Sequence, residues 1–197
     1  MGATMAVHFL LLELTDPVVN AFLWRVRHIL TGHYGKGPIH VTLRGPYEGD
    51  SPRKVLEDAR AKLKYDVLRI AGVGRFSNPG EEVVFFRVDS PHLREVWWKK
   101  SFPIERYGFE PHVSVYRGHD ADFADEAAAI LREEHVELMC AEHRLVWYKT
   151  KQPDLFTPSS PSVGAMVGLE QSGRTAILDR VERRVDSYRA RQMASRP

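Results

Sequence analysis

Two short segments of the chain share one pattern, in which a histidine is followed two residues later by a hydroxyl side chain. Residues 38–44 contain His40 and Thr42, and residues 110–117 contain His112 and Ser114. Each histidine closely follows a proline and precedes β-branched residues, so both segments predict an extended entry into a β-strand. Because strand side chains alternate between two faces, each histidine shares a face with its hydroxyl residue, and the residues between them point toward a core.

The segments that surround these two motifs repeat one order of expected elements. Residues 7–76 and residues 82–149 each predict a strand, a helix, the motif strand, a further helix and a closing strand or hairpin. Such a repeat most simply folds as two pseudo-symmetric α+β lobes, with sheets that line a shared cleft and helices on the outer faces. We therefore expect a single bilobed domain in residues 1–150, with one motif histidine from each lobe facing the cleft.

The paired motifs resemble those of the two-histidine (2H) phosphoesterase superfamily, which includes RNA 2′,3′-cyclic phosphodiesterases, the 2′-5′ RNA ligases and related oligonucleotide phosphodiesterases. The resemblance covers roughly residues 7–149. It implies a duplicated bilobed α+β fold, with two mainly antiparallel sheets around a central cleft. It also implies that His40, Thr42, His112 and Ser114 are catalytic.

The motif residues suit the chemistry that this resemblance implies. Hydrolysis of a phosphodiester needs a base for the attacking water and an acid for the leaving oxygen, and histidine can take either role near neutral pH. The hydroxyl groups can bind the non-bridging oxygens as negative charge develops. By resemblance to cyclic phosphodiesterases that leave a 2′-phosphate, His40 is expected to be the acid and His112 the base, although the residues themselves leave the two roles interchangeable.

Three further residues are candidates for substrate binding. Alternation places Arg44 on the face of His40 and Tyr116 on the face of His112, where an arginine could bind phosphate and a tyrosine could stack on a base. The alternatives are a solvated arginine at a strand end and an edge tyrosine. Arg117 follows the second motif, where the resemblance implies a phosphate contact. Strict alternation turns Arg117 away from the cleft, so a bulge or the end of the strand would have to redirect it.

Composition and other motifs narrow the class of protein. No His-Glu-x-x-His or Asp-rich pattern occurs, and two motif histidines are a poor metal set, so we expect neither a metal nor another cofactor. The single cysteine, Cys140, excludes an intramolecular disulfide and suits a reducing compartment, so the cytoplasm is the expected location. No segment approaches the roughly 20 apolar residues of a membrane span. The net charge of +2 is too small to indicate nucleic-acid binding without a local basic patch.

Residues 151–197 differ in composition from the rest of the chain. A Pro/Ser-rich linker is expected first, followed by a basic amphipathic helix whose apolar residues recur at helical spacing, namely Ile177, Val181, Val185 and Tyr188. This helix could dock on the body of the protein or on a second copy in a homo-oligomer. Contact with RNA or a membrane surface is the other alternative.

The leading hypothesis is a metal-independent 2H-type phosphodiesterase that acts on an RNA or oligonucleotide phosphodiester. A 2′,3′-cyclic phosphate opened to a 2′-phosphate is the expected substrate. The alternatives are a phosphodiesterase for cyclic dinucleotides or 2′-5′-linked signalling oligonucleotides, and a module that binds nucleotides or RNA in the same cleft without turnover. Substrate specificity depends on cleft loops that sequence alone does not position.

Overall fold

The computed structural model describes residues 7–33, 37–48, 53–97, 109–149 and 173–195, and the expected linker before the last helix lies outside these ranges. The strands are β1 (Val7–Leu14), β2 (His40–Glu48), β3 (Leu68–Asn78), β4 (Glu81–Asp89), β5 (His112–Gly118), β6 (Glu137–Cys140) and β7 (His143–Lys149). The helices are α1 (Pro17–Thr31), α2 (Arg53–Leu63), α3 (Leu93–Val96), α5 (Ala121–Glu133) and α7 (Arg174–Ala194).

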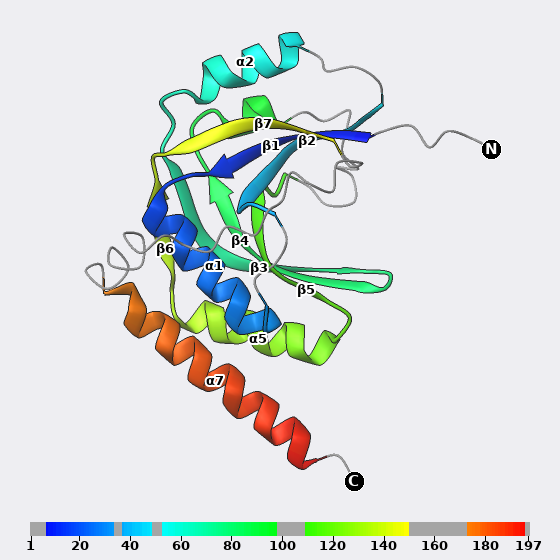
Figure 1. The fold of residues 1–197 in the computed structure, drawn as a ribbon, viewed down its shortest axis with the longest axis vertical. Helices are drawn as coiled ribbons and strands as arrows, with labels where there is room; N and C mark the ends of the chain where they lie inside the picture. The colour runs from blue at the N-terminus through cyan, green and yellow to red at the C-terminus, as the bar shows by residue number, and fades with distance from the viewer. Residues whose placement is uncertain (1–6, 34–36, 49–52, 98–108, 150–172, 196–197) are drawn as a thin grey trace, which may run out of the picture.

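The strands form two antiparallel sheets, with the order β2-β1-β7 in one and β5-β4-β3-β6 in the other (Figure 1). This arrangement confirms the expected α+β class, with two antiparallel sheets and a C-terminal helix. The motif strands β2 and β5 each lie at one edge of their sheet.

The two sheets do not coincide with the two halves of the sequence. The last strand of the first half, β3, joins the sheet of β4 and β5, and the last strand of the second half, β7, pairs with β1. The expected lobes at residues 7–76 and 82–149 are therefore wrong as divisions of the sheets. The cause is local, because Pro79 and Gly80 form a two-residue turn that makes β3 and β4 a hairpin, with Asn78 opposite Glu81.

Helix boundaries follow from capping residues in α1 and α5. The Asp16 carboxylate accepts hydrogen bonds from the backbone N–H groups of Val18 and Val19, each at 3.0 Å, and Gly32 ends α1 in the left-handed region at φ 74°. In the same way the Asp120 side chain caps α5. The first helix expected in residues 82–149 is reduced, within the described residues, to the four residues of α3.

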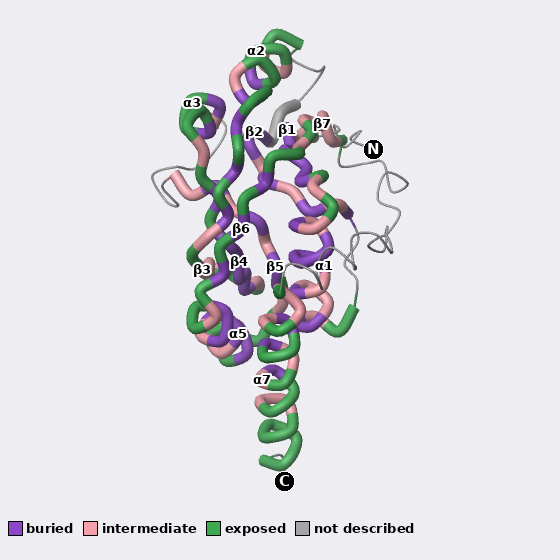
Figure 2. Tube along the Cα trace, turned by 90° about the vertical axis from the view of Figure 1, so that its left-hand side faces the viewer, coloured by how far each residue is buried: buried purple, intermediate pink, exposed green. Residues whose placement is uncertain are grey.

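One continuous hydrophobic core joins both sheets with α1, α5 and α7 (Figure 2). It includes Leu10 and Leu12 of β1 and Val84 and Phe86 of β4, all of which are fully buried. Burial of each such side chain contributes about 1.5–3 kcal/mol relative to exposure. The two sheets are thus parts of a single packed unit.

The C-terminal helix α7 packs along α1 and α5 (Figure 1). Of the expected apolar stripe, Val181 and Val185 are buried, and Ile177 and Tyr188 are partly buried against the core; Leu178 is buried in addition. Arginines on both sides of this stripe form ion pairs with the body, including Arg180 with Glu134 at 2.7 Å. The helix is therefore docked on its own chain, which was one of the alternatives for it.

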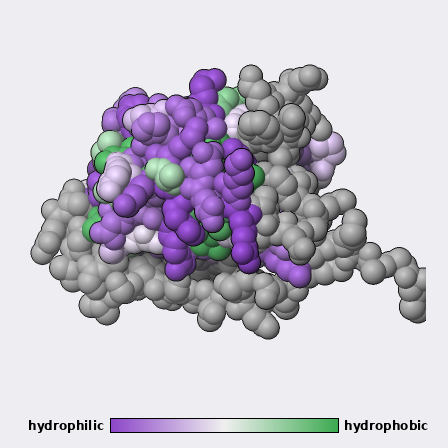
Figure 3. All heavy atoms as spheres, turned by 90° about the horizontal axis from the view of Figure 1, so that it is seen from above, coloured by the Kyte–Doolittle hydropathy of each residue, from purple (hydrophilic) through white to green (hydrophobic). Residues whose placement is uncertain are grey.

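The described residues at the end of the molecule that carries α2 are mostly hydrophilic (Figure 3). Within the described residues, no helix combines the length and the apolar character needed to cross a lipid bilayer.

Candidate active site

A cavity of about 560 Å³ brings the two motifs together. His40 and Thr42 of β2 and His112 and Ser114 of β5 all line it, so the edge strands of the two sheets contribute equivalent pairs. Its volume lies within the range of about 300–1,000 Å³ that is usual for small-molecule sites.

The two histidines are anchored in the same way. His40 Nδ1 lies 2.9 Å from the carbonyl oxygen of Pro38, and His112 Nδ1 lies 2.8 Å from that of Glu110. Because a carbonyl oxygen can only accept a hydrogen bond, each Nδ1 must carry a hydrogen atom. The other ring nitrogen, Nε2, is then the one that can accept or donate the catalytic proton in both residues.

Aromatic side chains enclose His112. Its ring centroid lies 4.7 Å from that of Phe85 and 5.0 Å from that of Phe76, which meets it edge to face. The Phe85 ring in turn occupies the space above Gly74, where an added Cβ atom would lie 2.2 Å from the ring. Gly74 is therefore required for the position of the aromatic wall against which His112 packs.

Burial and neighbouring arginines lower the pKa values of both histidines. For His40 the main cause is loss of solvation, and Arg27 and Arg117 add to it, whereas the hydrogen bond to the Pro38 carbonyl acts in the opposite direction. For His112 the main cause is again loss of solvation, and Arg117 contributes further. Both pKa values therefore lie below the ordinary value of about 6.5, and both rings are mostly neutral at pH 7.

A β-bulge in β5 directs Arg117 into the cavity. Ser114 pairs with Phe85 and Tyr116 pairs with Val84, so Val115 is an extra residue in this strand. The bulge reverses the alternation after Val115. Arg117 consequently lines the cavity. The sequence allowed this position only if a bulge or the end of the strand redirected the side chain.

The same bulge turns Tyr116 largely into the core. Its side chain is 8% exposed, and its ring packs against that of Phe123 at a centroid distance of 5.1 Å. Tyr116 still contributes to the wall of the cavity. Tyr116 therefore lies between the cavity and the core, and its ring is not freely exposed for stacking.

An equivalent bulge in β2 has the opposite consequence for Arg44. Thr42 pairs with Leu11 and Arg44 pairs with Leu10, so Leu43 is the extra residue. The expected position of Arg44 in the cleft is wrong. Its side chain is 6% exposed and does not line the cavity, and its Nε atom donates a hydrogen bond to the carbonyl oxygen of Val96 at 2.6 Å.

The place that corresponds to Arg117 in the first motif strand is taken by Gly45, since each lies five residues after its histidine. Gly45 adopts φ 129°, and an added Cβ atom would lie 2.7 Å from the ring of Phe9, which lines the cavity. A glycine is needed here for both reasons. The two motif strands thus supply equivalent imidazole and hydroxyl groups but only one arginine.

Arg27 of α1 supplies a second cation, which was not expected from the sequence. Its side chain lines the cavity, and its Nη2 atom donates a hydrogen bond to the carbonyl oxygen of Ser114 at 2.9 Å. Loss of solvation, together with repulsion from Arg117, lowers the pKa of Arg27 to about 10. A possible signal in the sequence is that its helical neighbours at i−4, i−3 and i+3 are all apolar, namely Leu23, Trp24 and Leu30.

Neither a reactive thiol nor a metal-binding group is found among the described residues. Burial raises the pKa of the Cys140 thiol to about 12, so this thiol is not a candidate nucleophile. Over the ranges that the structure describes, no group of three or more His, Cys, Asp or Glu side chains is arranged to hold a metal ion. His33 is exposed and lines the cavity.

Comparison with protein families identifies one match, to the model of the 2′-5′ RNA ligase superfamily, over residues 15–152. The matched region runs from the start of α1 to the end of β7 and includes both motif strands. It leaves β1 and α7 outside. Neither the comparison with curated proteins nor that with solved structures found a match.

Proposed function

The chain belongs to the 2′-5′ RNA ligase superfamily, within the 2H phosphoesterases, and we propose that it is a metal-independent phosphodiesterase that opens a 2′,3′-cyclic phosphate at the end of an RNA or oligonucleotide. The product in this proposal is a 2′-phosphate. The observation that carries the proposal is the pair of histidines in one cavity, each with its Nδ1–H group held by a backbone carbonyl.

The proposed reaction needs one neutral and one protonated imidazole. Neutral His112 accepts a proton at Nε2 from water, whose oxygen attacks the phosphorus atom. The bond between phosphorus and the 3′-oxygen breaks, and protonated His40 gives its Nε2 proton to that oxygen. The hydroxyls of Thr42 and Ser114 donate hydrogen bonds to the non-bridging oxygens as their charge increases.

Arg27 and Arg117 provide positive charge for the same phosphate. Both line the cavity, and no carboxylate in the described residues lies within 4.0 Å of the Arg27 guanidinium. Arg117 is only loosely paired, since both Glu81 oxygens lie 3.3 Å from its Nη1 atom. An anionic phosphate would offset the repulsion between the two arginines and would raise the pKa values of both histidines. This explains how a site with neutral histidines can provide a protonated acid once substrate is bound.

The direct test is incubation of the protein with RNA that ends in a 2′,3′-cyclic phosphate, with a chelator present. We expect hydrolysis, and phosphorus NMR of the product should identify a 2′-phosphate. Cyclic dinucleotides and 2′-5′-linked oligonucleotides are the matched comparison substrates, and faster turnover of either would reassign the substrate. If the native chain cleaves none of the three but still binds them, and the double variant His40→Ala/His112→Ala binds equally well, the cleft is a binding module.

A further inference from the structure

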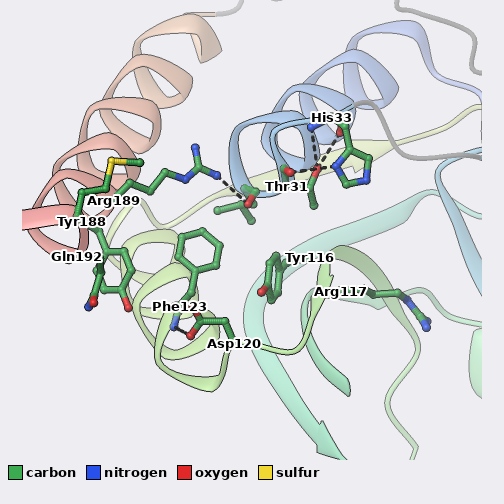
Figure 4. A pocket seen from close by; sticks show the side chains of 11 residues that line it. Thr31, His33, Tyr116, Arg117, Asp120, Phe123, Tyr188, Arg189 and Gln192 are labelled. Atoms are coloured by element: carbon green, nitrogen blue, oxygen red, sulfur yellow. Dashed lines mark hydrogen bonds between the residues drawn. The ribbon is translucent and has the colours of Figure 1, made fainter. Parts of the chain in front are cut away.

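A second cavity, of about 430 Å³, adjoins the catalytic one (Figure 4). The two cavities share four lining residues, which are Thr31, His33, Tyr116 and Arg117. These residues come from the end of α1, the segment after it and strand β5. The second cavity is therefore a neighbouring compartment on the side of the active site that faces α5 and α7.

Helix α7 forms one wall of this second cavity through residues that the superfamily match does not include. Tyr188, Arg189, Gln192 and Met193 all line it, whereas the match ends at residue 152. Hydrogen bonds to α1 hold α7 in this position, because Arg189 Nη2 donates to the carbonyl oxygens of Ile29 and Leu30 at 3.0 and 3.1 Å. The compartment is thus formed in part by a helix that lies outside the region matched to the superfamily.

The walls combine aromatic faces with a few polar groups. The rings of Tyr116, Phe123 and Tyr188 follow one another, with centroid distances of 5.1 and 5.6 Å. Tyr116 and Phe123 are largely buried, so Tyr188 offers the most accessible ring face. The Gln192 side chain, the Tyr188 hydroxyl and the Asp120 carboxylate stand beside them (Figure 4). A nucleobase has the matching chemistry, since it offers an apolar flat face and an edge of hydrogen-bond donors and acceptors.

The charges in the second cavity favour a base over a second phosphate. Arg189 already donates to two carbonyl oxygens, and its guanidinium carbon lies 5.6 Å from the centre of the Phe123 ring. The Asp120 carboxylate would repel an anion. Arg117 lies on the boundary with the catalytic cavity, where it can bind the reacting phosphate.

We propose that the cavity against α7 binds the nucleobase of the nucleotide whose phosphate occupies the catalytic site. This inference rests on the proposed function for the identity of that phosphate. It assigns to α7 the role of a specificity element, which receives the base while the two histidines act on the phosphate.

Binding of inert products tests the inference without depending on turnover. We would measure, by calorimetry on the full chain, the affinity for nucleoside 2′-monophosphates and for methyl riboside 2-phosphate, which lacks a base. Gln192→Trp fills the cavity and should weaken the nucleoside ligands about tenfold or more, as expected for loss of a base-stacking site. The ligand without a base should be unaffected. Arg183→Trp, at an exposed position of α7 that does not line the cavity, is the matched control and should change neither affinity.

Two results would overturn this assignment. One is equal affinity of the native protein for the ligands with and without a base. The other is a similar loss for both ligands in Gln192→Trp, which would indicate damage to the phosphate site. Failure of the proposed function would give a different result. The native protein would cleave no phosphodiester, but it could still show base-dependent binding that Gln192→Trp abolishes.

Discussion

Arg27 Nη2 donates a hydrogen bond to the carbonyl oxygen of Ser114 at 2.9 Å, so a helix from the first half of the chain places a cation beside the second motif. The side chain is partly buried in the cavity wall, and its pKa is lowered to about 10. Burial of a cation without an opposing carboxylate costs stability. Such a cost is typical of functional sites, where a ligand supplies the missing charge.

Replacement of Arg27 by methionine should therefore lower activity without lowering stability. Arg27→Met keeps the length of the side chain but removes its charge, and we expect kcat/KM for a cyclic phosphate to fall by about 10²–10³, in the range for a lost charge-stabilising donor. The urea midpoint of unfolding should stay the same or rise, because a partly buried cation without a carboxylate partner has been removed. Steady-state kinetics and urea denaturation measure the two effects on one sample.

Arg25 provides the matched control for this substitution. It lies two residues away on α1 and pairs with Glu182 of α7 at 3.1 Å, outside the cavity. Arg25→Met should leave kcat/KM unchanged. If Arg27→Met destabilised the protein and retained full activity, Arg27 would be a structural residue and would have no role in phosphate binding.

The histidine roles can be separated by the leaving group. Removal of either side chain, in His40→Ala or His112→Ala, should lower kcat by about 10²–10⁴, the usual range for lost acid–base catalysis. A substrate with an activated leaving group needs no acid, so it should restore the rate of His40→Ala and leave His112→Ala slow. Rescue of His112→Ala alone would reverse the assignment, and equal rescue of both would contradict a mechanism with one acid and one base.

The pH dependence of kcat/KM should show the lowered pKa values of the histidines. The base must be neutral and the acid protonated, so the profile is bell-shaped, and both limbs shift to lower pH when both pKa values are lowered. We expect an optimum on the acid side of about pH 6.5 for the free enzyme. Arg117→Gln removes a cation that lowers both pKa values, so it should move both limbs to higher pH.

Arg69 is a suitable control for the pH profile, because it is an exposed arginine that pairs with Glu137 and does not line the catalytic cavity. Arg69→Gln should leave both limbs in place. An Arg117→Gln profile with lower rates but unshifted limbs would mean that Arg117 binds substrate without affecting the histidines.

The sequence predicted most of the elements, because strand alternation and helix caps are local properties, and the internal repeat predicted that His40 and His112 would share a cleft. Its errors arose where contacts distant in sequence decide the outcome. Arg44 was expected in the cleft, but the additional residue Leu43 in β2 reverses the alternation after Thr42. Bulges depend on pairing with a neighbouring strand, so the pattern of one strand does not reveal them.

The exchange of β3 and β7 between the sheets has a similar origin. The internal repeat indicated which elements are equivalent, but it could not indicate which sheet each closing strand would join. Arg27 was missed because its proximity to Ser114 depends on how α1 packs against β5. Helical periodicity alone gives the face of a side chain on its own helix and says nothing about the strand opposite.

Gly74 offers a last prediction, which connects the packing of β3 and β4 to catalysis. An added methyl group in Gly74→Ala would lie 2.2 Å from the Phe85 ring, so the ring must move, and with it one wall around His112. We expect a loss of about 1–3 kcal/mol in the free energy of unfolding, as for other overpacked cores. Activity should also fall, because the position of His112 depends on that wall.

A double-mutant cycle distinguishes displacement of the ring from a general effect of the methyl group. Phe85→Leu creates space for the new methyl group, so the stability cost of Gly74→Ala should be much smaller in the Phe85→Leu background than in the native one. Activity of the double variant should remain low, because the aromatic contact with His112 is still lost. Additive stability effects would show that the methyl group does not act through Phe85, and full activity in Gly74→Ala would show that His112 does not depend on this ring.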